Sequence, residues 1–198
     1  MLALPDPPLA DDLVRLREPA ARDLDAVVEA CQDPLVQRYT RVPMPYEEAD
    51  GRAFIGGAAG RRILGQSLEL VIAGREDDVL LGMIGLIADR HDALRAEIGY
   101  WVAPTARGRG VATRALALLS RWCVTIGGFE RLDLQAATAN EASLRVAQHC
   151  GFVREGVLRN SWYRGGGRSD MVLFSLVPED MAPFTRNDRT VSGEEQRG

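Results

Sequence analysis

The sequence predicts a single α/β domain with a mixed, mainly antiparallel sheet of about seven strands, flanked by helices. Its 198 residues, 46% hydrophobic and 26% charged, suit one globular domain with a sizeable core. Three strand patterns follow one another at residues 68–73, 80–88 and 97–102 with short polar turns between them, which indicates an antiparallel meander. A helical pattern over 110–126 then leads to a strand at 132–137, which indicates a right-handed parallel crossover.

Apolar periodicity, interrupted by proline and glycine, predicts the remaining elements. Residues 13–17 alternate like an edge strand, and residues 24–31 form a short helix that ends near Asp33-Pro34. A second helix over 46–62 is weakened by Gly51, Gly56 and Gly57. After the crossover, the pattern predicts a helix over 140–150, strands over 153–160 and 171–177, and a loop over 161–169 between those two strands.

Composition sets the outer boundaries of the domain. Residues 1–10 are expected to be flexible, residues 11–180 to form the domain, and the polar and charged residues 181–198 to form a disordered tail. The sequence shows no signal-peptide pattern and no apolar run long enough to cross a bilayer, so we expect a cytoplasmic protein with no membrane partner. The formal net charge of −4 argues against a general nucleic-acid binder.

The cysteines and histidines give no sign of a disulfide framework or a metal site. Cys31, Cys123 and Cys150 sit in helical patterns without paired spacing, so we expect reduced packing cysteines. His91 and His149 are the only histidines and lack zinc-like spacing, so we expect no metal.

A basic, glycine-rich turn separates the strand at 97–102 from the helix at 110–126. Arg107, Gly108, Arg109 and Gly110 form this turn, and the helix begins directly after them. Backbone N–H groups converge at such a turn, and a helix N-terminus adds roughly half a positive charge. The arrangement predicts a ligand that carries phosphates.

Three phosphate-binding motifs compete for this turn. A P-loop requires a lysine, and all 24 basic side chains of this chain are arginines. A dinucleotide fingerprint requires a final glycine or alanine, whereas the hexapeptide from Gly108 ends in Thr113. Residues Arg107 to Ala112 fit the third pattern, which is Gln or Arg, two residues, Gly, one residue, and Gly or Ala. This pattern resembles the acyl-CoA loop of the GNAT acetyltransferases.

A second segment strengthens this resemblance. Asn140 and Ser143 begin a predicted helix that Gly151 closes, and Phe152 opens the next strand. This Asn-x-x-Ser pattern is similar to the second coenzyme-binding motif of the GNAT superfamily, although Asn140 also suits a helix N-cap. The likeness extends over about residues 13–177 and is greatest to the RimJ/RimL-type branch, which acetylates protein N-termini.

The resemblance implies a cosubstrate and a set of residues that bind it. The cosubstrate is acetyl-CoA, with no metal, and small residues in the turn allow the pyrophosphate to approach the backbone. The residues implied are Trp101, Val102, Arg107, Gly108, Arg109, Gly110, Val111, Ala112, Thr113, Asn140 and Ser143.

Glu97 is the candidate catalytic base. It lies in an otherwise apolar and aromatic strand, where partial desolvation would strengthen its hold on a proton. It also resembles the base that several GNAT enzymes carry at the start of the central strand. The competing interpretation is a structural ion pair with an arginine at the rim of the sheet. By resemblance, a backbone N–H near Trp101 or Val102 would polarise the thioester oxygen.

The resemblance to RimL-like enzymes implies that Ser143 donates a proton to the departing thiolate. A water molecule or Tyr163 remains an alternative donor. Trp162 and Tyr163, in the predicted loop, either border the acceptor channel or cover the edge of the sheet. We take them as candidate acceptor-binding residues.

The expected reaction is acetyl transfer from acetyl-CoA to a primary amine, with the N-terminus of a protein or peptide as the first choice. The alternatives are a small amine, such as an amino acid, polyamine or aminoglycoside, and a non-catalytic acyl-CoA sensor. No nucleic-acid partner is expected, and a homodimer is left open.

Overall fold

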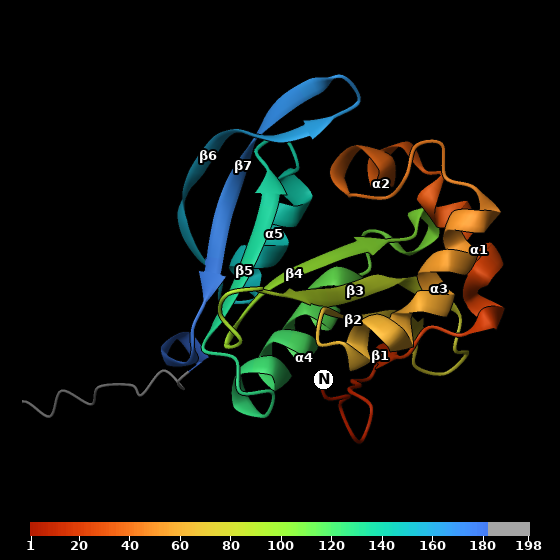
Figure 1. Ribbon diagram of the computed structural model, residues 1–198, viewed down its shortest axis with the longest axis horizontal. Coiled ribbons are helices and arrows are strands. Elements are labelled where there is room, and N and C mark those ends of the chain that lie inside the picture. The colour runs from red at the N-terminus through yellow and green to blue at the C-terminus, as the bar shows by residue number, and fades with distance from the viewer. Residues whose placement is uncertain (182–198) are drawn as a thin grey trace, which may run out of the picture.

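The computed structural model describes residues 1–181, which form a seven-stranded sheet with helices on both faces (Figure 1). The strand order is β1-β2-β3-β4-β5-β7-β6, and neighbouring strands are antiparallel except for the parallel pair β4 and β5. This confirms the predicted fold class, including the meander and the parallel crossover. The strands are β1 (Val14–Arg17), β2 (Ser67–Gly74), β3 (Leu80–Ala88), β4 (Arg95–Val102), β5 (Arg131–Ala137), β6 (Val153–Arg164) and β7 (Gly167–Leu176).

Different helices cover the two faces of the sheet. Successive side chains of a strand point to opposite faces, so each strand contributes to both cores. On β2, Leu70 and Ile72 pack in the core that the fourth and fifth helices complete. Val71 and Ala73 point the other way and pack with Val27 of the first helix. The helices are α1 (Leu24–Cys31), α2 (Pro34–Tyr39), α3 (Glu48–Ile63), α4 (Val111–Thr125) and α5 (Glu141–His149).

The short helix α2 was not predicted. It begins where the sequence was expected to end the first helix, at Asp33-Pro34. Asp33 Oδ1 accepts hydrogen bonds from the backbone N–H groups of Leu35 and Val36, both at 3.0 Å, and Pro34 occupies the first turn. Asp followed by Pro therefore starts a helix here. Six residues are too few to show helical periodicity.

The predicted loop over residues 161–169 was wrong, because both strands of the hairpin continue through it. β6 extends to Arg164 and β7 begins at Gly167. The two residues between them, Gly165 and Gly166, have φ values of 58° and 82°. A two-residue hairpin turn with positive φ at both positions matches the twist of the strands, and glycine adopts it without steric cost.

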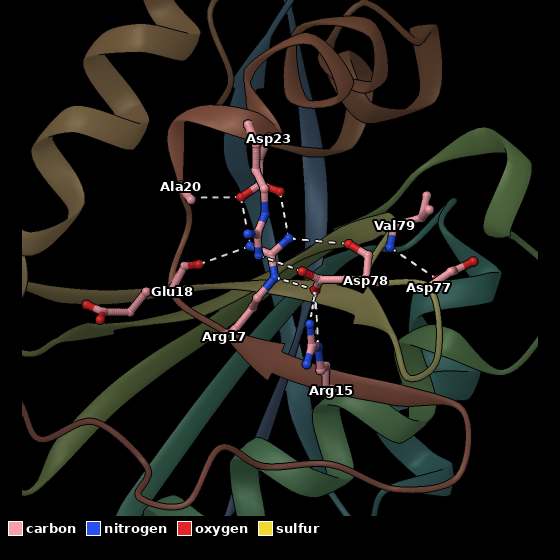
Figure 2. Close-up of polar contacts among 9 residues, drawn as sticks. Arg15, Arg17, Glu18, Ala20, Asp23, Asp77, Asp78 and Val79 are labelled. Atoms are coloured by element: carbon pink, nitrogen blue, oxygen red, sulfur yellow. Dashed lines mark hydrogen bonds and ion pairs between the residues drawn. The ribbon is translucent and has the colours of Figure 1, made fainter.

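Arg17 ties β1 to the beginning of α1 (Figure 2). Its two terminal nitrogens donate to the two carboxylate oxygens of Asp23 at 2.8 and 2.7 Å, and its Nε donates to Asp78 Oδ1 at 2.7 Å. Asp78 lies in the turn between β2 and β3, where bonds from Arg15 and Arg17 lower its pKa to about 2. The network holds α1 against one end of the sheet.

The N-terminal residues before β1 contact both α3 and β1. The Leu2 N–H donates to the Arg62 carbonyl at 3.0 Å, and Ala10 forms an isolated bridge with Arg15. The flexibility expected for residues 1–10 stays a prediction, and the tail expected over 181–198 lies almost entirely outside the described residues. Within residues 1–181, no helix has both the length and the apolar character needed to cross a bilayer.

Candidate active site

The site lies where the two parallel central strands separate. β4 and β5 pair only over Arg95–Glu97 and Arg131–Asp133, and then diverge toward their C-terminal ends. A cavity of about 1060 Å³ occupies this region and is lined by β4, β5, the α4 N-terminus, α5 and the helices α1 to α3. Beyond Glu97, β4 remains paired with β3 but is unpaired on the side that faces β5, and residues from both faces of β4 line the cavity.

The glycine-rich turn has the backbone geometry that an anion site requires. Gly108 and Gly110 both have a φ of 75°, which side-chain-bearing residues rarely adopt, and Gly110 is the N-cap of α4. The first N–H groups of α4, beginning at Val111, have no partner inside the helix. They are available to phosphate oxygens at the edge of the cavity.

The structure gathers nearly all of the predicted coenzyme residues around one cavity. Trp101 and Val102 at the end of β4, the turn and first residues of α4, and Asn140 and Ser143 of α5 all line it. Arg109 is the exception and does not line the cavity. The two segments that the sequence separates by some thirty residues thus meet, because α5 follows directly on β5, the parallel neighbour of β4.

Arg107 makes a contact that the sequence did not reveal. Its Nη2 lies 2.5 Å from Oδ1 of Asp33, the N-cap of α2. The Arg107 guanidinium holds the pKa of the Asp33 carboxyl below its usual range. This ion pair joins the glycine-rich turn to α2, on the other face of the sheet from α4.

Glu97 lies on the β4 face that points toward α1 and α3, and it lines the cavity. Arg41 Nη2 lies 3.2 Å from Glu97 Oε1, and Gln135 Nε2 donates to Oε2 at 3.5 Å. The Glu97 side chain is 31% exposed. The ion pair of the competing interpretation is therefore present, but it lies inside the cavity where a base would also have to lie. Neither Arg41 nor Gln135 had been predicted as a site residue.

Ser143 forms a hydroxyl pair with Tyr100 on the opposite face of β4. The two hydroxyl oxygens are 2.9 Å apart, and Asn140 Oδ1 accepts the Ser143 N–H at 3.2 Å as the N-cap of α5. Burial raises the pKa of Tyr100 to about 12, so its hydroxyl stays protonated at neutral pH. Tyr100 had been missed, although strand alternation places it opposite Glu97.

The hairpin β6–β7 contributes one of the two candidate acceptor residues. Trp162 lines the cavity, and the Arg41 guanidinium lies 5.2 Å from its ring centroid. Tyr163 does not line the cavity and is 65% exposed. Arg164 links the hairpin to α2 and to the segment after it, because it donates to the carbonyl of Gln37 in α2 at 2.9 Å and to the carbonyl of Val42 beyond α2. Figure 1 shows the hairpin reaching over α2.

The fold and the arrangement of the site match a known family of enzymes. Residues 14–153 match the family model described as "Acetyltransferase (GNAT) domain". The chain belongs to the GNAT family of acetyltransferases.

Several relatives and solved structures lie in the RimJ/RimL branch of this family, and others are named as spermidine N(1)-acetyltransferases. YdaF of Bacillus subtilis (strain 168) is 35% identical over 104 residues, and the ribosomal-protein-serine acetyltransferase of Escherichia coli (strain K12) is 29% identical over 104 residues. Each match covers 52% of this chain and 57% of the relative, so the chain spans little more than half the length of these two proteins. Mycobacterium smegmatis RimJ in complex with CoA-disulfide superposes with a TM-score of 0.77 and 26% identity, covering 88% of this chain and 87% of RimJ.

Proposed function

We propose that this chain transfers the acetyl group of acetyl-CoA to the N-terminal amine of a protein or peptide. One observation carries the proposal. Glu97 and the Tyr100–Ser143 pair lie on opposite faces of the same strand, at the point where β4 leaves β5. A proton acceptor on one face and a proton donor on the other suit a reaction that takes a proton from an amine and gives one to a sulfur atom.

In this mechanism the turn from Arg107 to Gly110 and the first N–H groups of α4 bind the pyrophosphate of acetyl-CoA. The thioester then lies between the diverging strands, where a backbone N–H near Trp101 or Val102 polarises its carbonyl oxygen. The amine nitrogen bonds to the carbonyl carbon, and Glu97 accepts the proton released, directly or through water. When the C–S bond breaks, Ser143 donates a proton to the sulfur and regains one from solvent through Tyr100, and Glu97 releases the amine proton to solvent, so that both groups return to their starting protonation states.

The choice of an N-terminal amine rests on chemistry and on the relatives. An α-amine, with a pKa of about 8, is partly deprotonated near neutral pH, so a modest base such as a carboxylate suffices. The Escherichia coli relative is named for acetylating a ribosomal protein, and the RimJ structure belongs to the same branch. The cavity of about 1060 Å³ is lined in part by α2, α3 and Trp162 of the β6–β7 hairpin, and a volume of this size leaves room for a chain beyond the amine.

Thiol release tests the proposal. The protein is incubated with acetyl-CoA and a panel of N-terminal peptides, amino acids and polyamines, and the products are mapped by mass spectrometry. We expect acetylation of peptide α-amines and no turnover of the same peptides when they are already N-acetylated. Turnover confined to small amines would contradict the proposal. Acetyl-CoA binding measured by calorimetry, without turnover of any amine, would instead indicate a sensor.

A further inference from the structure

We propose that Arg41 recognises a carboxylate beside the reacting amine, so that the preferred acceptor is an N-terminal segment with an acidic side chain at its first or second residue. The inference deepens the proposed function and rests on it. Three features support it: the backbone of Arg41 is fixed, most N–H groups of its guanidinium are free within residues 1–181, and its partner Glu97 is the group that an arriving ammonium would bind.

Arg41 lies on a segment whose backbone is fixed from two sides. Thr40 ends α2, and its hydroxyl donates to the Val36 carbonyl at 2.7 Å. On the other side of Arg41, the Val42 carbonyl accepts a bond from Arg164 of the β6–β7 hairpin, which also binds the Gln37 carbonyl. The backbone of Arg41 is therefore held by the fold, which lowers the ordering entropy lost when its side chain binds a ligand.

Within the described residues, most donors of the Arg41 guanidinium are free. Its Cζ lies 5.2 Å from the Trp162 ring centroid, and among residues 1–181 its one side-chain hydrogen bond goes from Nη2 to Glu97 Oε1. The side chain is 57% exposed and lines the cavity. A guanidinium offers five N–H groups in a rigid fork that fits a carboxylate with two parallel bonds.

The other arginines that line the cavity already have partners that the acceptor does not displace. Arg61 binds Glu69 at 2.8 Å, Arg107 binds Asp33 at 2.5 Å, and Arg145 binds Glu141 at 3.3 Å. Arg41 differs, because its anionic partner among residues 1–181 is Glu97, the group that an acceptor ammonium approaches in the proposed mechanism.

Charge pairing explains why the acceptor should carry an acid. An ammonium that binds Glu97 competes with Arg41, whose partly exposed ion pair at 3.2 Å contributes little stability. Without a new partner, the Arg41 charge would remain within a few ångströms of the arriving ammonium and repel it. A carboxylate on the acceptor removes this repulsion, because the four charges then form two pairs.

Matched acceptors and matched variants test the inference. The acceptors are two peptides that differ only in Asp or Asn at the second residue, together with a free amino acid and its amide. The variants are R41Q and the control R38Q. Arg38 stacks over Tyr39 at 5.3 Å, and neither Arg38 nor Tyr39 is one of the site residues proposed above.

The measured quantity is the ratio of kcat/KM values within each acceptor pair. For the wild type and R38Q we expect about a tenfold preference for the acidic peptide, as a charge-assisted bond supplies, and in R41Q we expect that preference to vanish. The wild-type preference should also shrink at high salt, because the pair is partly exposed.

Three outcomes would contradict the carboxylate recognition by Arg41 or the peptide acceptor. Equal kcat/KM for both peptides in the wild type would contradict it. An equal loss on both peptides in R41Q would show that Arg41 only positions Glu97. A preference seen only between the amino acid and its amide would keep the carboxylate recognition but contradict a peptide acceptor.

A binding experiment separates failure of the inference from failure of the proposed function. If no acceptor is acetylated, the proposed function fails. The same peptides are then titrated by calorimetry into the protein loaded with coenzyme A. We expect the acidic peptide to bind about tenfold more tightly to the wild type and equally to R41Q. Equal affinities in the wild type would overturn the inference.

Discussion

The proposed coenzyme side and the proposed acceptor side of this site are built in different ways. Backbone geometry over a short continuous stretch, residues 101–113, supplies most of the coenzyme side. Side chains from four separate segments supply the acceptor side, namely Arg41, Glu97, Gln135 and Trp162. The coenzyme side therefore depends on local conformation, whereas the acceptor side depends on how distant segments pack. Substitutions should separate these two kinds of dependence.

The largest effect is expected on the coenzyme side from Gly110→Glu. The substitution puts a side chain where φ is 75° and a negative charge where we propose that the pyrophosphate binds. Acetyl-CoA affinity should fall by at least about a hundredfold, because like-charge contact costs several kcal/mol. Calorimetry measures the affinity, and thermal melting shows whether the fold persists.

A matched control for that experiment is Gly56→Glu. Gly56 lies in α3, has no positive φ and leaves a Cβ in open space. It adds the same charge away from the turn, so acetyl-CoA affinity should stay near the wild-type value. Undiminished affinity in folded Gly110→Glu would contradict the assignment of the turn.

On the acceptor side, Glu97→Gln should lower kcat by roughly a hundredfold while acetyl-CoA affinity stays nearly intact. Glutamine keeps the size and hydrogen bonding of Glu97 but does not accept the amine proton. Raising the pH should partly restore the rate, because more of the amine arrives deprotonated. The measurement is a pH series of kcat beside thermal melting.

A purely structural Arg41–Glu97 ion pair predicts the opposite result for that variant. Stability would fall, kcat of the remaining folded protein would change little, and high pH would not restore activity. Glu48→Gln serves as a control, because Glu48 pairs with Arg52 on the surface of α3 and does not line the cavity.

Substitutions in the Tyr100–Ser143 hydroxyl pair should lower kcat by a smaller factor. The double variant should show whether the two hydroxyls act together. Ser143→Ala should lower kcat by about a hundredfold or less, and Tyr100→Phe by about tenfold, with little change in coenzyme affinity. Because the two oxygens are 2.9 Å apart, the double variant should lose little more than Ser143→Ala alone. Fully multiplicative losses in single-turnover rates would show that the two hydroxyls act independently.

The smallest effect is expected where the two sides are connected, from Asp33→Asn. Asparagine still caps α2 but gives up the ion pair with Arg107. Acetyl-CoA should bind up to about fivefold more tightly, because an ion pair of this kind is worth at most about 1 kcal/mol and Arg107 becomes free for phosphate. Calorimetry on the two proteins measures the change.

The pH dependence of stability checks the same ion pair. The pKa of Asp33 is below its usual range in the folded protein, so its contribution is present above about pH 4 and is lost as pH falls. The difference in unfolding free energy between wild type and Asp33→Asn should therefore shrink at low pH. A difference that does not change with pH would show that the ion pair contributes nothing to stability.

The sequence by itself determined the fold class, most of the elements and the glycine-rich turn before α4. These features follow from periodicity and from local chemistry: alternating strands, an amphipathic helix, and glycines at the positions where φ is positive. It also predicted Glu97, because a carboxylate within an apolar strand stands out. It missed α2, which is too short for its periodicity to show, and it read the Gly165–Gly166 turn as a longer loop.

Only the tertiary structure decided which side chains meet. Tyr100 contacts Ser143 across 43 residues of sequence, Arg41 contacts Glu97 across 56, and Arg107 contacts Asp33 across 74. No local pattern encodes such contacts, since strand order and the packing of the hairpin against α2 bring these segments together. Trp162 and Tyr163 show this most directly. They are adjacent in the chain, yet strand alternation places Trp162 in the cavity and Tyr163 in solvent.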